Sequence, residues 1–306
     1  MERAHSPCLL IGGIKMLKSS RLKTLSNLWF VIPVIIIIAS LLVFPLFFGG
    51  YLSFFKSVFR GVPKTFQGFT NYVKVLTDID FYKSFLRTGI YTASAIIIKI
   101  ILGILFALAL NKKFRGIGIF RGIALIPWSI PPFVVALIWY GILDWSGPIN
   151  EILHSLNIQT VDWFSYDTAL ITIIMINIWK GWPFFFMSVL SGLQAIPDQL
   201  YEAAEIDGAG VWKSFWKITL PSLKPVILTT TLLSTIWTFG EFETVYLTTA
   251  GGPGDATRTL PILIYETAFS KFKLPLGITQ SILILPIFLV AIFWVVKLMA
   301  KTEGDL

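Results

Sequence analysis

Six long apolar segments dominate this chain and limit the folds open to it. Each holds about twenty residues with few or no charges, enough for one helix to cross a hydrocarbon core of about 30 Å. The segments lie at 28–48, 88–110, 122–143, 168–190, 226–247 and 278–299. Because 55% of the 306 residues are hydrophobic and only 14% are charged, lipid is the solvent expected around most of the surface. The sequence therefore predicts an all-α polytopic membrane protein with six transmembrane helices.

The basic residues of the connecting loops predict how the chain is oriented in the membrane. The loop at 111–121 holds four lysines and arginines, whereas the loop at 144–167 holds four acids and no lysine or arginine. Positive loops favour the cytoplasmic side, so we expect both terminal segments, 1–27 and 301–306, to be cytoplasmic. Six basic residues in the loop at 49–87 run against this rule. Topology and anionic lipid explain the net charge of +8 without a nucleic-acid partner.

The stretch between the fourth and fifth apolar segments is too patterned for a plain connection. Asp198 is placed to cap a first helix, which Gly208 and Gly210 are expected to end. A second helix with aromatic residues at its apolar positions follows, and Pro221 and Pro225 are expected to end it. The pattern predicts a short helix, a glycine turn and a second short helix on the water side of the membrane.

This stretch, the coupling loop at 198–225, resembles the EAA loop of ABC importer permeases. The matching positions are Glu202, Ala203, Ala204, Asp207, Gly208, Ala209, Phe215, Ile218, Leu220, Pro221 and Pro225. The resemblance implies that the loop inserts into a groove on an ATP-hydrolysing subunit, where Glu202 pairs with a basic residue. It also implies that Asp207 and Gly208 form the turn between the two short helices. An amphipathic helix lying in the membrane interface is the alternative.

Polar residues in the fourth and fifth apolar segments indicate a pathway for a hydrophilic substrate. In each set the residues recur at i, i+3, i+4 and i+7, which is one face of a helix. The first set is Asn177, Lys180, Gly181 and Phe184, and the second is Ser234, Trp237, Thr238 and Glu241. A carboxylate inside a bilayer is costly, so these faces must meet protein or water. Hydroxyls, aromatic rings and a carboxylate together suit a sugar, whose hydroxyls need hydrogen bonds and whose C–H faces stack on rings.

Three ionisable residues in the apolar segments have more than one possible role. Lys180 and Glu241 either face the substrate or neutralise one another where the fourth and fifth segments touch. Lys99 lies in the middle of the second segment and is expected in a cavity or beside a partner helix. In a secondary transporter, all three groups would serve as proton or ion relays without ATP.

The two polar sets also resemble the sugar-contacting positions of maltose-type permeases. This alignment is counted back from Ile196-Pro197 for the first set and from the glycines at 251–252 for the second. Lys180 and Glu241 are charged where the family pattern has uncharged residues, which leaves the identity of the substrate open. A phosphorylated polyol such as glycerol phosphate is an alternative substrate, with Lys180 as the partner of its anion.

The outer loop at 248–277 carries a further resemblance, to the LT-x-GGP pattern of sugar-importer permeases. Its matching residues are Thr249, Gly251, Gly252, Pro253, Ala256, Thr257, Tyr265, Ala268 and Phe269. Two glycines and a proline specify a sharp turn. By the resemblance, Gly251, Gly252 and Pro253 contact an extracytoplasmic sugar-binding protein.

These resemblances cover residues 28–300 and imply the type I ABC importer permease (MetI-like) fold, in its maltose-type (MalF-like) branch. They imply a bacterial or archaeal cytoplasmic membrane, with a second homologous permease, two ATP-binding subunits and the sugar-binding protein as partners. ATP and Mg²⁺ are expected in the partner ATPase, because this chain has no GK[ST] phosphate loop, and no cofactor is expected here. Two isolated histidines and one cysteine argue against a metal site or a membrane-embedded enzyme, so no catalytic residue is assigned.

Overall fold

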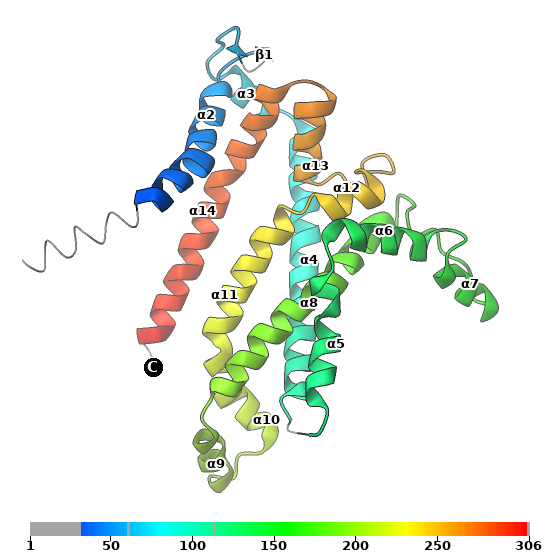
Figure 1. Cartoon of the computed structure of the whole chain (residues 1–306), viewed down its shortest axis with the longest axis vertical. Coiled ribbons are helices and arrows are strands. Elements are labelled where there is room, and N and C mark those ends of the chain that lie inside the picture. The colour runs from blue at the N-terminus through cyan, green and yellow to red at the C-terminus, as the bar shows by residue number, and fades with distance from the viewer. Residues whose placement is uncertain (1–31, 60–61, 113, 305–306) are drawn as a thin grey trace, which may run out of the picture.

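The computed structural model describes residues 32–59, 62–112 and 114–304, which form helices, connecting turns and one small hairpin (Figure 1). Five helices in this part of the chain are long and apolar enough to cross a membrane. They are Ile32–Leu52, Ile79–Leu110, Pro132–Ser155, Ala169–Ala195 and Leu274–Leu298. Two shorter apolar helices, Ile117–Ser129 and Leu260–Ser270, accompany them. The predicted all-α class is confirmed.

The helices and strands follow in chain order, first for residues 39–155 and then for residues 169–304. The first half contains η1 (Ala39–Val43), α2 (Phe44–Leu52), β1 (Val58–Phe59), β2 (Val62–Pro63), α3 (Thr70–Leu76), α4 (Ile79–Leu110), α5 (Ile117–Ser129), α6 (Pro132–Leu143) and α7 (Pro148–Ser155). The second half contains α8 (Ala169–Ala195), α9 (Asp198–Ile206), α10 (Val211–Ser214), η2 (Phe215–Thr219), α11 (Leu220–Phe239), α12 (Glu243–Thr249), α13 (Leu260–Tyr265), η3 (Glu266–Ser270) and α14 (Leu274–Gly304). The η elements are π-helical turns, and β1 pairs antiparallel with β2.

Three helices, α4, α8 and α11, form the core of the molecule. α4 and α8 pack closely because Gly103 has no side chain: a Cβ there would lie 2.4 Å from Phe185 Cβ. α11 approaches α8 in the same way at Gly192, where a Cβ would lie 2.7 Å from Leu223 Cδ2. Close packing at small residues is typical of helices that associate inside a membrane.

Two apolar helices flank this core and leave most of their surface uncovered. None of the residues in the most apolar stretch of Ile32–Leu52 is buried, and few are in the corresponding stretch of Leu274–Leu298. Figure 1 shows the first helix diverging from α14 toward the N-terminal end of the drawn chain. In a membrane, such surfaces face lipid or another subunit.

Two predicted spans differ from the helices that form. The span predicted at 88–110 belongs to the longer α4, which begins at Ile79 because Asp78 accepts a hydrogen bond from the Asp80 backbone N at 2.9 Å and caps the helix. The span predicted at 122–143 is two helices, α5 and α6. The break falls at Ile130, whose backbone is extended as expected for a residue before proline.

The region predicted as the coupling loop and fifth span also needs correction. Asp198 is the first residue of α9, where its charge favours the helix dipole, and Pro197 occupies the cap position. Pro221 and Pro225 do not end the second helix: η2 continues into α11 through both. Pro221 lies in the first turn of α11, directly after the wider π-helical turn. α11 ends at Phe239, well short of residue 247, because Gly240 closes it.

Candidate functional site

All eight residues predicted for the substrate pathway line one cavity of about 70 Å³ in the helix core. The cavity lies where α4, α8 and α11 meet, with the end of α5 at one side. Its lining residues are Lys99, Trp128, Asn177, Lys180, Gly181, Phe184, Ser234, Trp237, Thr238 and Glu241. A cavity of this size has room for only a few water molecules. A sugar would therefore need further space from a second subunit or from movement of the helices.

Lys99 enters the cavity from the middle of α4. It is 2% exposed, and its Nζ donates a hydrogen bond to Thr238 Oγ1 on α11 at 3.1 Å. Its side chain passes over Gly181 of α8, where a Cβ would lie 2.5 Å from Lys99 Cε. Gly181 therefore makes room for the lysine, and Lys99 brings the three core helices together. The structure places this residue both in a cavity and beside a partner helix, the two positions expected from the sequence.

Lys180 and Glu241 line the same cavity but form no ion pair within 4 Å with any residue in the described part of the chain. The two groups thus share the cavity without a direct ion pair, and their mutual neutralisation stays a prediction. Glu241 also does not share a helical face with Ser234, because it lies in the turn after α11. Its Oε1 accepts hydrogen bonds from the Thr244 backbone N at 3.2 Å and from Thr244 Oγ1 at 2.7 Å. The carboxylate thus connects the cavity to the start of α12.

Three aromatic rings form one wall of the cavity. The Trp128 and Phe184 rings stack with centroids 6.0 Å apart and an angle of 18° between their planes. Phe184 meets Trp237 at 5.1 Å and 55°. Rings with exposed faces can stack on the C–H face of a sugar. Trp128 is absent from the predicted pathway residues, because an aromatic residue in an apolar segment is typical of any membrane span.

Polar atoms without partners lie beside these groups. Asn177 is buried, and its Oδ1 has no hydrogen-bond partner among the described residues. The hydroxyl of Tyr91 on α4 is also buried and lies close to the Asn177 side chain. An unsatisfied buried polar atom costs about 1–3 kcal/mol. A ligand hydroxyl or a water molecule that bonded Asn177 would therefore stabilise the site.

The predicted coupling residues lie at the end of the molecule that Figure 1 draws lowest. Glu202, Ala203 and Ala204 belong to α9, and Asp207, Gly208 and Ala209 form the turn that follows. Gly208 has a φ of +71°, and its N–H donates to Glu205 O at 3.0 Å. A glycine with positive φ at this position is a common helix ending, so the prediction that Gly208 ends the first helix is confirmed. None of the residues of α9 is buried.

The predicted binding-protein contacts form a turn at the opposite end. Gly251 is buried with a φ of +89°, whereas Pro253 is exposed. Gly251 therefore shapes the turn and cannot offer a surface to another protein, while Pro253 can. The outer loop at 248–277 is also more regular than predicted, since it contains α13 and η3.

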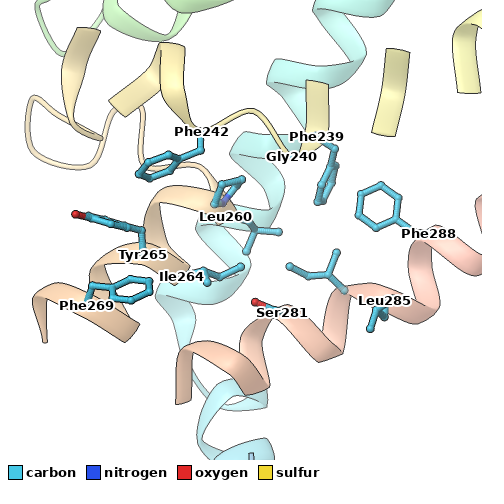
Figure 2. A pocket seen from close by; sticks show the side chains of 12 residues that line it. Phe239, Gly240, Phe242, Leu260, Ile264, Tyr265, Phe269, Ser281, Leu285 and Phe288 are labelled. Carbon is cyan, nitrogen blue, oxygen red and sulfur yellow. The ribbon is translucent and has the colours of Figure 1, made fainter. Parts of the chain in front are cut away.

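A separate cavity of about 470 Å³ lies between the end of α11, α13, η3 and α14 (Figure 2). Figure 2 shows Phe239 and Phe288 on one side and Tyr265 and Phe269 on the other. Among its lining residues, only Tyr265 and Ser281 have polar side chains. A ligand rich in hydroxyls would find few hydrogen-bond partners there, so this cavity does not suit a sugar.

Residues 99–302 match the family described as the binding-protein-dependent transport system inner membrane component. The match covers two thirds of the chain and includes the whole cavity and the coupling loop. The chain therefore belongs to this family of inner membrane transport subunits.

Three curated relatives extend the similarity over most of the chain. The trehalose/maltose transport system permease protein MalF of Thermococcus litoralis is 36% identical over 271 residues, which is 88% of this chain and 90% of the relative. The diacetylchitobiose uptake system permease protein DasB of Streptomyces coelicolor is 30% identical over 304 residues, covering 96% and 92%. The sulfoquinovosyl glycerol transport system permease protein SmoG of Agrobacterium fabrum is 35% identical over 249 residues, covering 80% of each. The predicted likeness to sugar importer permeases is confirmed.

Solved structures confirm the predicted fold. A bacterial ABC transporter involved in the import of the acidic polysaccharide alginate contains a chain that matches with a TM-score of 0.79. The match covers 94% of this chain and 99% of the other at 21% sequence identity. At that identity the likeness shows the fold alone, which is the ABC importer permease fold.

Proposed function

We propose that this chain is the membrane-spanning subunit of an ATP-driven carbohydrate importer and forms half of its translocation pathway. The observation that carries the proposal is the single core cavity, which gathers hydroxyls, an amide, a carboxylate, two lysines and three aromatic rings. The three relatives are named for trehalose and maltose, diacetylchitobiose and sulfoquinovosyl glycerol, all of which contain sugar units.

Each side-chain type in the cavity has a task in holding a sugar. Ser234 and Asn177 offer hydrogen bonds to hydroxyl groups, and Glu241 is a strong acceptor that retains its place by capping α12. Phe184 and Trp237 offer ring faces to the apolar side of a sugar ring. The small volume supports a pathway that is completed by a second homologous permease.

The exposure of the coupling loop supports the proposal that the energy for transport comes from another subunit. α9 has no buried residue, so its exposed face is free to enter a groove on an ATP-hydrolysing subunit. Two such subunits would hold the ATP and Mg²⁺, and their closure would move α9 together with the core helices. On this proposal the coupling loop and both termini are cytoplasmic, and the turn at Pro253 faces the outside.

The outer turn supports contact with a sugar-binding protein on that side. A transporter of the same fold, with a TM-score of 0.77, has been crystallised in complex with an alginate pentasaccharide-bound periplasmic protein. Pro253 is exposed in the turn of the outer loop, where such a protein could contact it. The proposed assembly therefore has four membrane and ATPase subunits, with the binding protein docking at the outer end.

The decisive variant for the pathway is Glu241→Gln, tested in the whole complex reconstituted in liposomes. Glutamine keeps an oxygen for Thr244 but loses the charge, so assembly should be unchanged. Hydrogen bonds to charged groups contribute about 1.5–3 kcal/mol, so substrate-stimulated ATP hydrolysis and uptake should fall roughly tenfold or more. Glu151→Gln, at an exposed glutamate in α7, is the matched control and should behave as wild type.

Two outcomes would refute the proposal at different points. If substrate stimulates ATP hydrolysis equally in Glu241→Gln and the wild type, the Glu241 carboxylate is not part of the pathway. Uptake driven by an ion gradient without ATP would remove the ABC mechanism. The coupling step is tested separately by Glu202→Arg, which should abolish co-purification of the ATPase subunits while the two permeases stay together.

A further inference from the structure

A polar cleft of about 790 Å³ lies at the end of the molecule that carries the coupling loop. It is bounded by the turn after α4, the start of α5, and the junction between α8 and α9. Its lining residues are Asn111, Lys112, Phe114, Arg115, Ile117, Arg121, Leu193, Gln194, Ile196 and Asp198. Except for Asp198, which begins the coupling loop, these residues have no part in the proposed pathway or coupling site.

The cleft has an excess of positive charge. Lys112, Arg115 and Arg121 face one carboxylate, that of Asp198, and none of these groups forms an ion pair within 4 Å in the described part of the chain. The first turn of α5 contains no acid, and its cap residue, Gly116, has no side chain that could cap the helix. The positive end of the helix dipole therefore adds to the three cations.

The three cations differ in how they are held. Arg121 donates from Nε and Nη2 to Leu110 O, at 3.2 and 2.8 Å, and so fixes the end of α4 against α5. Lys112 and Arg115 are exposed and have no such bond. Arg121 is thus part of the frame of the cleft, and the other two are free to meet an anion.

An apolar surface borders the cleft at Phe114, whose exposed ring contacts the exposed ring of Phe120 on α5, with centroids 5.8 Å apart. Ile119 and Ile123 are also exposed, on the face of α5 turned away from Ile117 and Arg121. In a membrane-spanning chain these side chains meet acyl chains or another subunit. A soluble anion would need the basic cleft alone, whereas a phospholipid needs a basic site beside an apolar helix face.

We infer that this cleft binds the phosphate headgroup of an anionic phospholipid from the leaflet on the coupling-loop side, with its acyl chains along α5. Basic pockets between membrane helices near this boundary suit such headgroups. Because Gln194 and Ile196 lie at the end of α8 just before α9, a bound headgroup bridges α5 to the start of the coupling loop. Anionic lipid would then hold α9 in its orientation and raise coupled ATP hydrolysis.

The test compares lipid retained by the purified whole complex, measured by mass spectrometry after exchange into phosphatidylcholine with added phosphatidylglycerol. Each basic residue near an anionic headgroup strengthens binding about fivefold, so the double variant Lys112→Gln, Arg115→Gln should bind phosphatidylglycerol roughly thirtyfold more weakly. Stimulation of ATP hydrolysis by phosphatidylglycerol should be lost with it. The control, Lys271→Gln, Lys273→Gln, removes two exposed charges at the other end and should retain the lipid.

Three results would overturn the inference. Equal retention of phosphatidylglycerol by the double variant and the wild type would exclude the headgroup site. Loss of the ATPase subunits from the double variant, with lipid retention unchanged, would make the cleft a protein contact. Displacement of the lipid by an equal concentration of soluble glycerol phosphate would show that α5 contributes nothing and that the ligand is a free phosphate.

Discussion

The outer loop and the coupling loop connect helices at opposite ends of the molecule, and they are stabilised in opposite ways. In the outer loop, Thr257 and Leu260 are fully buried, and Thr259 between them is nearly so. In the coupling loop, Val211 is 90% exposed and Trp212 is 74% exposed. The two loops have similar lengths and both contain glycine turns, so the difference lies in their contacts and not in their local geometry.

Two ion pairs and one buried hydrogen bond hold the outer loop against the first turns of α4. Arg87 pairs with Asp255 at 3.2 Å, and Arg258 pairs with Asp80 at 3.0 Å, so each segment supplies one cation and one anion. The Leu260 backbone N donates to Thr88 Oγ1 at 2.8 Å. All of these partners belong to this chain.

The coupling loop has far fewer contacts of this kind. Its one side-chain hydrogen bond between the two short helices joins Tyr201 and Thr219 at 2.9 Å, as far as the described residues show. The outer loop therefore has its stabilising contacts within this chain, whereas the coupling loop leaves most of its surface exposed.

The largest effect is expected when alanine replaces one positive-φ glycine in each loop, Gly251 in the outer loop and Gly208 in the coupling loop. At Gly251 a Cβ would lie 2.8 Å from Ile262 Cγ2, so left-handed backbone strain and overpacking together should lower the free energy of unfolding by about 2–4 kcal/mol. At Gly208 nothing lies within 4 Å, so strain alone should cost about 1 kcal/mol. Denaturant titration of the solubilised chain measures both. Equal losses would contradict the contrast between the loops.

A smaller effect is expected when one partner of an outer ion pair is removed. Arg87→Met leaves the partly buried Asp255 carboxylate without its cation and should cost on the order of 2 kcal/mol. In the coupling loop, Lys213→Met removes an exposed charge and should change stability by less than about 0.5 kcal/mol. The same titration distinguishes them. A loss for Lys213→Met as large as that for Arg87→Met would show that the coupling loop has stabilising charge contacts of its own.

Single hydrogen bonds should show the same difference at a finer scale. Thr257 Oγ1 donates to Gly252 O at 2.9 Å and lies 2.6 Å from Thr249 Oγ1, so Thr257→Val should cost about 1–2 kcal/mol. Tyr201→Phe removes a partly exposed bond and should cost about 0.5 kcal/mol. The midpoints of thermal unfolding in detergent compare the two. The order of the two losses matters more than their size, and a reversed order would contradict the comparison.

The smallest effect is a dependence of outer-loop stability on acid pH. Burial raises the pKa of Asp255, but the hydrogen bond and charge of Arg87, with Tyr166 and Arg258, lower it below its ordinary value of 3.8. A depressed carboxyl pKa stabilises the folded state above that ordinary value, and the stabilisation is lost as pH falls through the folded pKa. Thermal unfolding followed below pH 5 should show this loss in the wild type. Asp255→Asn should flatten the profile, and an unchanged slope would exclude Asp255 as its source.

Much of the core site could be predicted from the sequence because polar residues are so rare in apolar segments. The charges and hydroxyls in the fourth and fifth segments stand out, and all eight residues predicted from them line one cavity. Glu241 reaches the cavity from a turn and not from a helix face, since the end of α11 at Gly240 is a local event that periodicity does not show. The pathway role of these residues stays a prediction.

Other features depend on contacts between distant segments and carry no local pattern. Position 181 requires a glycine because of Lys99, which lies far away in the chain. Any side chain at this position would fill the space that Lys99 occupies. The pairing of Arg87 with Asp255 likewise joins residues whose spacing follows no period. Pro221 and Pro225 are misleading for a different reason, because the helix continues through both after a π-helical turn.

The long helix α4 links three places in the molecule at a fixed spacing. Its 32 residues rise about 48 Å in total, and the same helix carries Arg87 near the outer loop and Lys99 in the core, and it leads into Asn111 at the basic cleft. A hydrogen-bonded helix resists stretching, so the spacing between these three places is nearly constant. If the outer loop shifts, α4 must therefore tilt or rotate as one rigid helix. The basic cleft at the other end of α4 would then change its angle relative to any lipid or ATPase subunit bound there.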